Sequence, residues 1–300
     1  YFHQFAKTHG PCACAMAFRV KNAENALKYA ISQGARRYDQ IDIRSDEAPL
    51  AAIYGIGNSV LYFIDRYAEK SIYDQDFNYL PNIDLHPTGL GLKVIDHLTH
   101  NVCRGNMDVW ANFYQRIANF REIRYFDIEG KSTGLHSRAM TSPCGKIRIP
   151  INESADDHSQ IEEYLHDYKG EGIQHIALST EDIYQTVANL RAAGISFLST
   201  PDTYFDRVNS RVPGHGENLA LLRDLNILID GNPISNEGIL LQIFTQTVVG
   251  PIFFEIIQRK GNEGFGEGNF QALFDSIEED QFRRGIITPD KPGTSDNPNK

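Results

Sequence analysis

Several features that define other classes of protein are scarce or missing in this sequence of 300 residues. Lysine and arginine number 29 against 39 aspartates and glutamates, so the formal net charge is -10. This charge argues against a general nucleic-acid binder, because phosphate binding needs clustered basic side chains. No apolar run approaches the ~20 residues that span a membrane. We therefore expect neither nucleic acid nor a membrane among the partners.

Cysteine is also scarce, and its spacing excludes further classes. The four cysteines are Cys12, Cys14, Cys103 and Cys144, and they form neither a C-x-x-C pair nor the spacing of a disulfide framework. A reducing compartment is the default setting for such a chain, so the sequence predicts a cytoplasmic protein. Residue 1 is tyrosine and lies inside patterned sequence, so we expect further residues before it in the cell.

What the chain does have is a repeated order of elements. Each of three segments combines a strand with a following helix, at 14–20 and 21–34, 92–102 and 106–118, and 172–180 and 182–194. Short strand candidates follow, at 121–130, 134–140 and 146–153 in the second copy, and at 195–199, 238–247 and 251–259 in the third. The copies recur at intervals of about 80 residues, which predicts an α+β fold built from βαβββ units.

The predicted domain boundary lies at 71–91, a segment with proline, glycine and aspartate and little periodicity. We expect an N-terminal, non-catalytic domain at 1–80, which holds one βαβββ unit and looks truncated. A C-terminal catalytic domain at 92–285 would hold two units and end with an amphipathic helix at 269–285. Residues 286–300 are rich in proline, asparagine and aspartate and are predicted to be disordered.

One acidic residue stands in an unusually apolar strand candidate. Glu255 lies in the run PIFFEII, where a buried carboxylate would cost several kcal/mol unless a cation compensates it. His97 and His175 occupy the same place in two copies of the repeat, 175 − 97 = 78 residues apart, and Glu255 follows after 255 − 175 = 80 residues. Because side chains alternate along a strand, a cup-shaped sheet made from two units can bring all three to its inner face.

Two imidazoles and one carboxylate form the facial triad typical of non-haem Fe(II) oxygenases. We therefore predict Fe(2+) as the cofactor, with His97, His175 and Glu255 as its ligands and as the catalytic residues. Since ligand bonds are roughly 2 Å long, the two imidazoles should lie within about 5 Å of the Glu255 carboxylate.

The other histidines are not expected to bind this metal. His100 lies three positions beyond His97 in the same expected strand, so it points to the opposite face. Five more are predicted in loops or on helix surfaces: His86, His136, His158, His166 and His215.

The sequence around these residues resembles the 4-hydroxyphenylpyruvate dioxygenases of the bacterial type. Eight motifs support the resemblance in order and cover most of 10–285: IDHLTHNV, RYFDIEGKSTGL, IRIPINES, GEGIQHIALST, PDTYF, LLQIFTQT, FFEIIQRKG and GFGEGNF. The resemblance implies the vicinal-oxygen-chelate (glyoxalase/dihydroxybiphenyl dioxygenase-like) fold, in which paired βαβββ units form cup-shaped barrels. It also implies a reaction that converts 4-hydroxyphenylpyruvate and O2 to homogentisate and CO2 in tyrosine and phenylalanine catabolism.

The same resemblance implies roles for individual residues. It gives the iron the ligands His97, His175 and Glu255. It implies a substrate pocket that combines amides, one hydroxyl and aromatic walls: Ser137, Asn152, Gln160, Gln242, Phe244, Phe253, Phe265 and Phe270. Gln174 would lie near the iron, whereas strand alternation predicts that it points away from His175.

Three other functions are open on this scaffold. 4-Hydroxymandelate synthase shares the ligands and substrate but hydroxylates the benzylic carbon, and its pattern tends to an aliphatic residue at the place of Phe270. A metal-free small-molecule-binding protein would not need the intact triad, and a zinc or nickel isomerase of the glyoxalase type would carry more carboxylates per repeat. We expect 4-hydroxyphenylpyruvate and O2 as partners, and assembly of the chain into a dimer or tetramer.

Overall fold

The computed structural model describes most of the chain, namely residues 1–39, 50–67, 71–129, 134–157 and 159–273. The predicted tail at 286–300 and the greater part of the helix predicted at 269–285 lie outside the described residues.

The chain divides into two compact units. Residues 1–197 and 244–258 make up the first unit, and the described part of the second comprises 198–243 and 259–273. The domain boundaries placed at 80 and 92 from the sequence stay a prediction.

A small sheet of three strands lies in the first unit. The elements of this part of the chain are α1 (Phe2–His9), β1 (Ala15–Arg19), α2 (Ala23–Ser32), β2 (Ala51–Tyr54), the 3-10 helix η1 (Ile56–Asn58), β3 (Val60–Ile64) and α3 (Ile72–Asp76). The strand order is β1–β3–β2, with β1 parallel and β2 antiparallel to β3. The order of β1, α2, β2 and β3 follows the repeat predicted from the sequence.

A larger sheet contains the next two copies of the repeat. The second copy is β4 (Leu92–Val102), α4 (Met107–Ala118), β5 (Arg121–Glu129), β6 (Gly134–Thr141) and β7 (Arg148–Ser154). After α5 (Gln160–Tyr168), the third copy begins with β8 (Gly172–Thr180) and α6 (Ile183–Ala192) and closes with β11 (Phe253–Lys260). In the first unit these strands lie in the order β5–β6–β7–β4–β8–β11.

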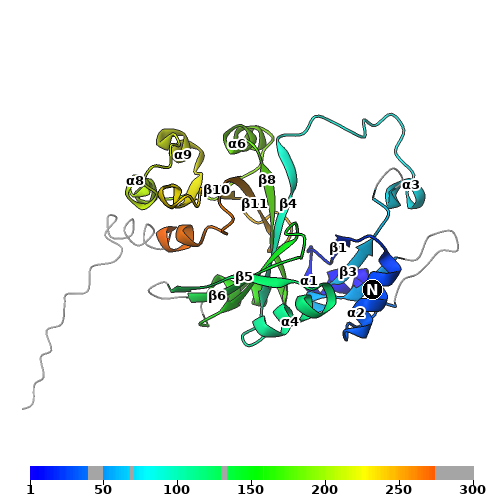
Figure 1. Cartoon of the computed structure of the whole chain (residues 1–300). Coiled ribbons are helices and arrows are strands. Elements are labelled where there is room, and N and C mark those ends of the chain that lie inside the picture. Colours follow the sequence, from blue (N-terminus) through cyan, green and yellow to red (C-terminus); the bar gives the residue numbers. More distant parts are fainter. Residues whose placement is uncertain (40–49, 68–70, 130–133, 158, 274–300) are drawn as a thin grey trace, which may run out of the picture. The chain divides into compact units, whose positions relative to one another are not determined.

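The pairing of these strands shows the internal symmetry of the repeat. In each copy the first strand pairs in parallel with the last, β4 with β7 and β8 with β11. The two first strands, β4 and β8, pair antiparallel and run side by side as long arrows in Figure 1. The copies therefore meet at their first strands, which is where the sequence places two histidines.

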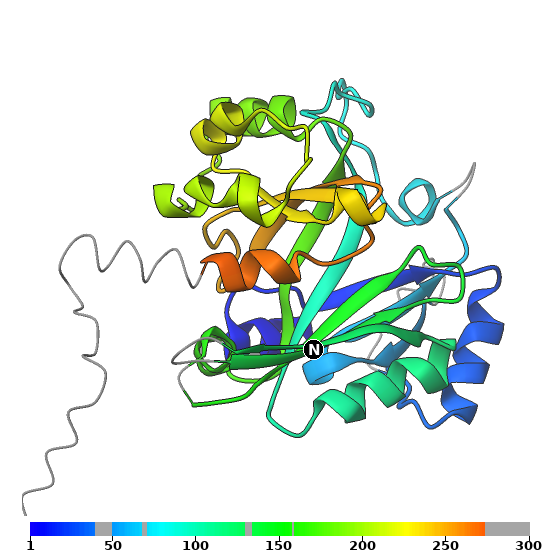
Figure 2. The same ribbon diagram turned by 60° about the vertical axis from the view of Figure 1, so that its left-hand side comes forward.

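The second unit holds the segment inserted into the third copy. Its elements are α7 (Asp202–Asp206), α8 (Val208–Arg211), α9 (Leu219–Leu225), β9 (Leu228–Gly231), η2 (Pro233–Ser235) and most of β10 (Ile239–Phe244), with β9 and β10 antiparallel. Residues 267–273 are helical and form the orange helix in Figure 2. Tyr204 links this helix to the inserted segment, since its hydroxyl donates a hydrogen bond of 2.6 Å to Oδ1 of Asn269.

Three expectations about local structure need comment. Residues 195–199 do not form the predicted strand, and only Phe197 forms a single bridge, with Thr245. Pro201, two residues beyond the segment, then leads into α7. His136 lies on β6 rather than in a loop, because a strand with one exposed face accepts polar side chains there. His158 lies outside the described residues.

A hydrophobic core in the first unit joins the small sheet to α4 and the larger sheet. Phe18, Leu61, Tyr114 and Ile151 belong to it and are at most 4% exposed. His100 is fully buried beside it, and its Nε2 lies 2.7 Å from the Tyr114 hydroxyl. His100 therefore faces away from His97, as strand alternation predicts.

This burial makes the free energy of unfolding depend on pH. Burial lowers the pKa of His100 from 6.5 to about 3, so the unfolded chain binds a proton more readily than the folded chain between these values. Stability is therefore full above pH 6.5 and falls as the pH drops, by about 2 kcal/mol between pH 7 and pH 5. Urea titrations at both pH values should show this difference in the free energy of unfolding for the native chain. For His100→Gln, the decrease between pH 7 and pH 5 should be smaller by about 2 kcal/mol. Equal pH dependence in both chains would contradict the assignment.

A tight approach between η1 and the segment before β8 in the first unit fixes Gly57 as glycine. Its φ is +55°, and a Cβ atom there would overlap the backbone carbonyl of Glu171. Gly57→Ala should lower the free energy of unfolding by about 3 kcal/mol, since it adds a backbone clash to left-handed strain. Gly145→Ala is the matched control, because Gly145 has φ +71° but open space around it. It should cost about 1 kcal/mol in the same urea titration, and equal losses would exclude the clash.

Candidate metal centre

Three neighbouring strands of the first unit carry the predicted metal ligands. His97 is on β4, His175 on β8 and Glu255 on β11, and Ala177 of β8 pairs across the sheet with both His97 and Glu255. His175 lies two residues before Ala177, so it shares a face with it. The sheet therefore directs all three side chains to one place.

The geometry of this group is compact and dry. The ligand atoms of His97, His175 and Glu255 all lie within 4.8 Å of one another. Oε2 of Glu255 is 3.2 Å from Nε2 of His97 and 3.4 Å from Nε2 of His175. The three residues are 3%, 7% and 2% exposed. These distances are shorter than the limit of about 5 Å that the ligand-bond length of roughly 2 Å sets.

The hydrogen bonds around the group fit a divalent metal. Nδ1 of His97 donates to Asp96 and Nδ1 of His175 donates to Gln174, which leaves both Nε2 atoms facing the carboxylate of Glu255. Oε1 of Glu255 is buried with no hydrogen-bond partner among the described residues. Lone pairs that converge in a dry space repel one another unless a cation lies between them. A metal ion would satisfy all three side chains at once.

Two of the three groups, Glu255 and His175, are in the ionisation state that binds a metal, whereas His97 would release a proton when a metal binds. Burial opposes a charge on His97, but the carboxylates of Glu255 and Asp96 outweigh it and raise the pKa of His97. Burial also opposes ionisation of Glu255, yet the positive charge of His97 and the close contacts with both imidazoles lower the pKa of Glu255 to about 2. Burial dominates at His175 and lowers its pKa. An ionised Glu255 and a neutral His175 are the forms that bind metals.

The expectation that Gln174 points away from His175 was wrong. Its Oε1 accepts a hydrogen bond of 3.0 Å from Nδ1 of His175. The register between β4 and β8 shifts at this point, so simple alternation does not hold there.

A row of polar side chains crosses the same face of the sheet next to the histidines. Ser137 on β6 pairs with Asn152 on β7, and its hydroxyl donates a hydrogen bond of 2.7 Å to Oδ1 of Asn152. Asn152 pairs in turn with Asn101 on β4. Sequence reasoning missed Asn101, which is fully buried and whose amide atoms have no hydrogen-bond partner among the described residues. Asn101 could have been found from its position four residues after His97, which places both side chains on the same face of the strand.

Two of the predicted aromatic residues lie beside the ligands. The Phe253 ring stacks on the His175 ring with centroids 4.8 Å apart, and the Phe244 ring meets the Phe253 ring edge-on at 5.9 Å. Gln160 differs from these, because it is exposed at the first residue of α5.

The remaining predicted pocket residues belong to the second unit. Gln242 is 1% exposed, and its Oε1 has no hydrogen-bond partner among the described residues. Phe265 is 6% exposed, and Phe270 is partly buried in the helix at 267–273.

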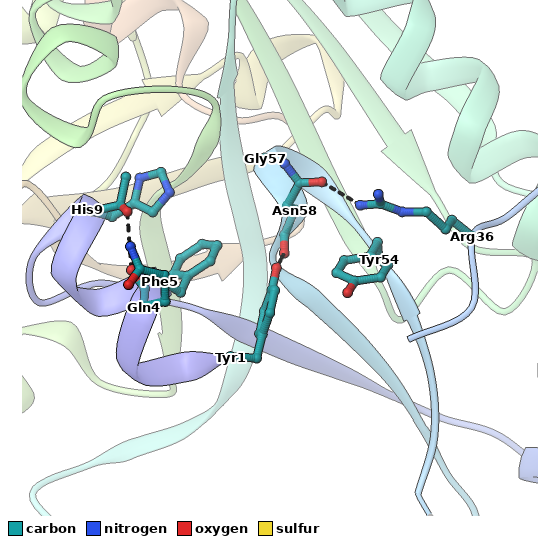
Figure 3. Close-up of a pocket in the computed structure, with 9 residues that line it drawn as sticks. Tyr1, Gln4, Phe5, His9, Arg36, Tyr54, Gly57 and Asn58 are labelled. Atoms are coloured by element: carbon teal, nitrogen blue, oxygen red, sulfur yellow. Dashed lines mark hydrogen bonds between the residues drawn. The ribbon is translucent and has the colours of Figure 1, made fainter. Parts of the chain in front are cut away.

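A cavity of about 310 Å³ in the first unit is separate from the metal ligands (Figure 3). It is lined by Tyr1, by residues of α1, β2 and η1, and by Arg36. The Arg36 cation is already engaged, since it donates a hydrogen bond of 2.6 Å to Oδ1 of Asn58 and lies 3.8 Å from the centre of the Tyr54 ring. None of the three predicted ligands lines this cavity, so it is not part of the candidate centre.

Family models match two parts of the chain. Residues 1–78 match the N-terminal domain of hydroxyphenylpyruvate dioxygenase, and residues 94–212 match the glyoxalase/bleomycin resistance protein/dioxygenase superfamily. Together with the paired βαβββ copies, these matches define a protein of the glyoxalase/dioxygenase superfamily and confirm the predicted vicinal-oxygen-chelate fold.

Comparison with individual relatives and solved structures identifies the family within this superfamily. The 4-hydroxyphenylpyruvate dioxygenase of Pseudomonas aeruginosa is 66% identical over 287 residues, which cover 96% of the chain and 80% of the relative. Hemolysin VllY of Vibrio vulnificus is 66% identical over 286 residues, with coverage of 95% and 80%. A triple mutant of 4-hydroxymandelate synthase from Streptomyces coelicolor is similar with a TM-score of 0.78 and 26% identity, covering 93% of the chain and 80% of that structure. The chain belongs to the 4-hydroxyphenylpyruvate dioxygenase family.

Within the described residues, none of the helices combines the length and the apolar character that a bilayer crossing requires.

Proposed function

We propose that this protein converts 4-hydroxyphenylpyruvate and O2 to homogentisate and CO2, with Fe(II) held by His97, His175 and Glu255. One observation carries the proposal: two buried imidazole nitrogens lie 3.2 and 3.4 Å from one oxygen of a buried carboxylate. Two histidines and one carboxylate are the donor set of non-haem Fe(II) oxygenases. The family to which the chain belongs supports the reaction.

The charge of the group suits an anionic substrate. Two neutral imidazoles and one carboxylate would leave a divalent ion with a formal charge of +1. Bound Fe(II) would supply a positive centre that chelates the carboxylate and keto oxygen of a 2-oxo acid, and the redox chemistry that activates O2. The burial of His97 and Glu255 excludes water from this space, which strengthens the attraction between the group and the substrate anion.

In this proposal the polar row binds the phenol end of the substrate. Asn101 lies two residues beyond Thr99, which pairs with His175 on the neighbouring strand. Two residues along a strand correspond to about 7 Å, comparable to the length of a hydroxyphenyl group. In this proposal the Asn152 amide, which is next to Asn101 on the adjoining strand, and the Ser137 hydroxyl bind the phenol of a substrate whose oxo-acid end is at the ligands.

Phe253 and Phe244 would orient the substrate ring. Phe253 stacks on His175 and Phe244 meets Phe253 edge-on, so they form an aromatic wall next to the ligands. Such a wall favours a parallel or edge-on aromatic ring over other orientations. We propose that Gln160, Gln242, Phe265 and Phe270 also bind the substrate. We further propose that the enzyme is cytoplasmic and that it assembles as a dimer or tetramer.

The proposal is tested by anaerobic reconstitution with Fe(II), followed by measurement of O2 uptake with 4-hydroxyphenylpyruvate. We expect uptake that depends on both metal and substrate, and homogentisate as the product in chromatography. Hydroxymandelate as the main product would show that the protein is a 4-hydroxymandelate synthase instead. Absence of uptake from a chain that has bound one Fe(II) would exclude both dioxygenase functions.

A further inference from the structure

Each candidate ligand histidine contacts the residue just before it in the sequence. Oδ1 of Asp96 lies 2.8 Å from Nδ1 of His97, and Oε1 of Gln174 lies 3.0 Å from Nδ1 of His175. Neighbouring side chains on a regular strand point to opposite faces, so such contacts need a local departure from regular geometry.

The strand pairing supplies this departure twice. Between Ile95 and His97, β4 advances two residues while β8 advances one, so Asp96 is the extra residue on β4. Between residues 173 and 175, β8 advances two residues while β4 advances one, so Gln174 is the extra residue on β8. An extra residue of this kind is a β-bulge, which turns a side chain away from its regular direction. The repeat thus places one bulge before each ligand.

The two bulged residues differ in charge. Asp96 is 7% exposed, and its second oxygen, Oδ2, lies 3.5 Å from Nη1 of Arg148 on β7. The carboxylate is therefore held between an imidazole and a guanidinium. Gln174 offers His175 only a neutral amide oxygen. One ligand thus has an anionic partner and the other a neutral one.

We propose that Asp96 is a positioning residue for the metal, and that it makes His97 the stronger of the two imidazole ligands. By accepting the Nδ1 proton, Asp96 fixes the tautomer in which Nε2 of His97 carries the free lone pair, and its charge increases the electron density that His97 donates. Gln174 fixes the tautomer of His175 without adding charge. This inference rests on the proposed function, since it takes the group to hold a divalent cation.

Titration of the metal-free chain with Co(II) tests the inference directly, with the dissociation constant and the visible absorption spectrum as readouts. Asp96→Asn keeps the shape of the side chain and removes its charge. It should weaken Co(II) binding about 10- to 100-fold, as expected for a lost partner of a ligand, and shift the absorption bands. Asp127→Asn is the matched control, because Asp127 contacts Nδ1 of His136 at 2.5 Å on an exposed part of the sheet. It should leave both readouts unchanged.

A second variant separates positioning from a purely structural role. Asp96→Asn combined with Gln174→Glu moves the carboxylate from one ligand to the other and should return the dissociation constant to within about 10-fold of the native value. Failure of this exchange to restore binding, or native binding with a native spectrum in Asp96→Asn, would overturn the inference.

Circular dichroism of each variant shows whether it folds. If Asp96→Asn does not fold, Gln174→Glu alone carries the test, since a second carboxylate partner should tighten Co(II) binding about 10-fold and shift the spectrum. An unchanged constant and spectrum would overturn the inference in that case. A native chain that binds neither Co(II) nor Fe(II) would instead overturn the proposed function.

Discussion

Glu255→Ala should abolish O2 uptake with 4-hydroxyphenylpyruvate while the chain keeps its fold. The carboxylate of Glu255 is the only anionic member of the three-residue group that the structure brings together. Removing one partner of a buried charge pair costs about 3–5 kcal/mol. This loss corresponds to metal binding that is weaker by about 10²- to 10⁴-fold. O2 uptake at micromolar Fe(II) and circular dichroism are the two measurements.

Glu255→Gln gives this experiment its control for shape. Glutamine fills nearly the same volume but carries no charge, so the account predicts the same loss of O2 uptake as for alanine. Native uptake in either variant, with the metal content of the native chain, would exclude Glu255 as a ligand. Loss of uptake in Glu255→Ala alone would mean that the side chain acts by packing.

Replacement of two histidines three positions apart on β4 should give opposite results. His97→Ala should weaken metal binding at least about 100-fold, because one of the three donors is lost. His100→Ala should leave the metal affinity within about threefold of native and instead lower the free energy of unfolding by about 3 kcal/mol, since it leaves a cavity and a buried Tyr114 hydroxyl without its partner. Metal titration and urea titration of both variants measure these effects.

Each of the two variants, His97→Ala and His100→Ala, is the control for the other. Both side chains are buried imidazoles on the same strand, with 3% and 0% exposure, so general effects of burial are shared. Loss of metal binding in His100→Ala with native stability would show that the face of β4 is assigned wrongly.

The repeat made most of the fold, and the convergence of the predicted ligand side chains, predictable from the sequence. His97 and His175 fill equivalent places in two copies, and β4 and β8, which carry them, are paired directly. Alternation along β4 was enough to separate His97 from His100. These inferences succeeded because they depend on the period of a strand, which is the same in every sheet.

Alternation failed where the strand is irregular. Gln174 was expected to point away from His175, but the bulge on β8 turns it toward the ring. No residue type in the sequence marks the bulges at Asp96 and Gln174, so only the pairing of the strands locates them. Asn101 was missed for another reason. Its even spacing from His97 predicts that both side chains lie on the same face of the strand, but no pattern in the sequence indicates a functional role for Asn101.

The substrate pocket was predicted from the resemblance more than from periodicity. Phe253 lies on a strand that carries a predicted ligand, Asn152 lies on the strand next to β4, and Ser137 lies one strand further away. Gln160 is exposed at the start of a helix, and its role in substrate binding stays a prediction.

Anomalous diffraction at the iron absorption edge, from crystals of the chain loaded anaerobically with Fe(II), tests the central claim most directly. The account predicts one strong peak per chain, at about 2 Å from Nε2 of His97, Nε2 of His175 and a carboxylate oxygen of Glu255. A peak bound by other side chains, or no peak between these three in a chain that takes up O2, would contradict it.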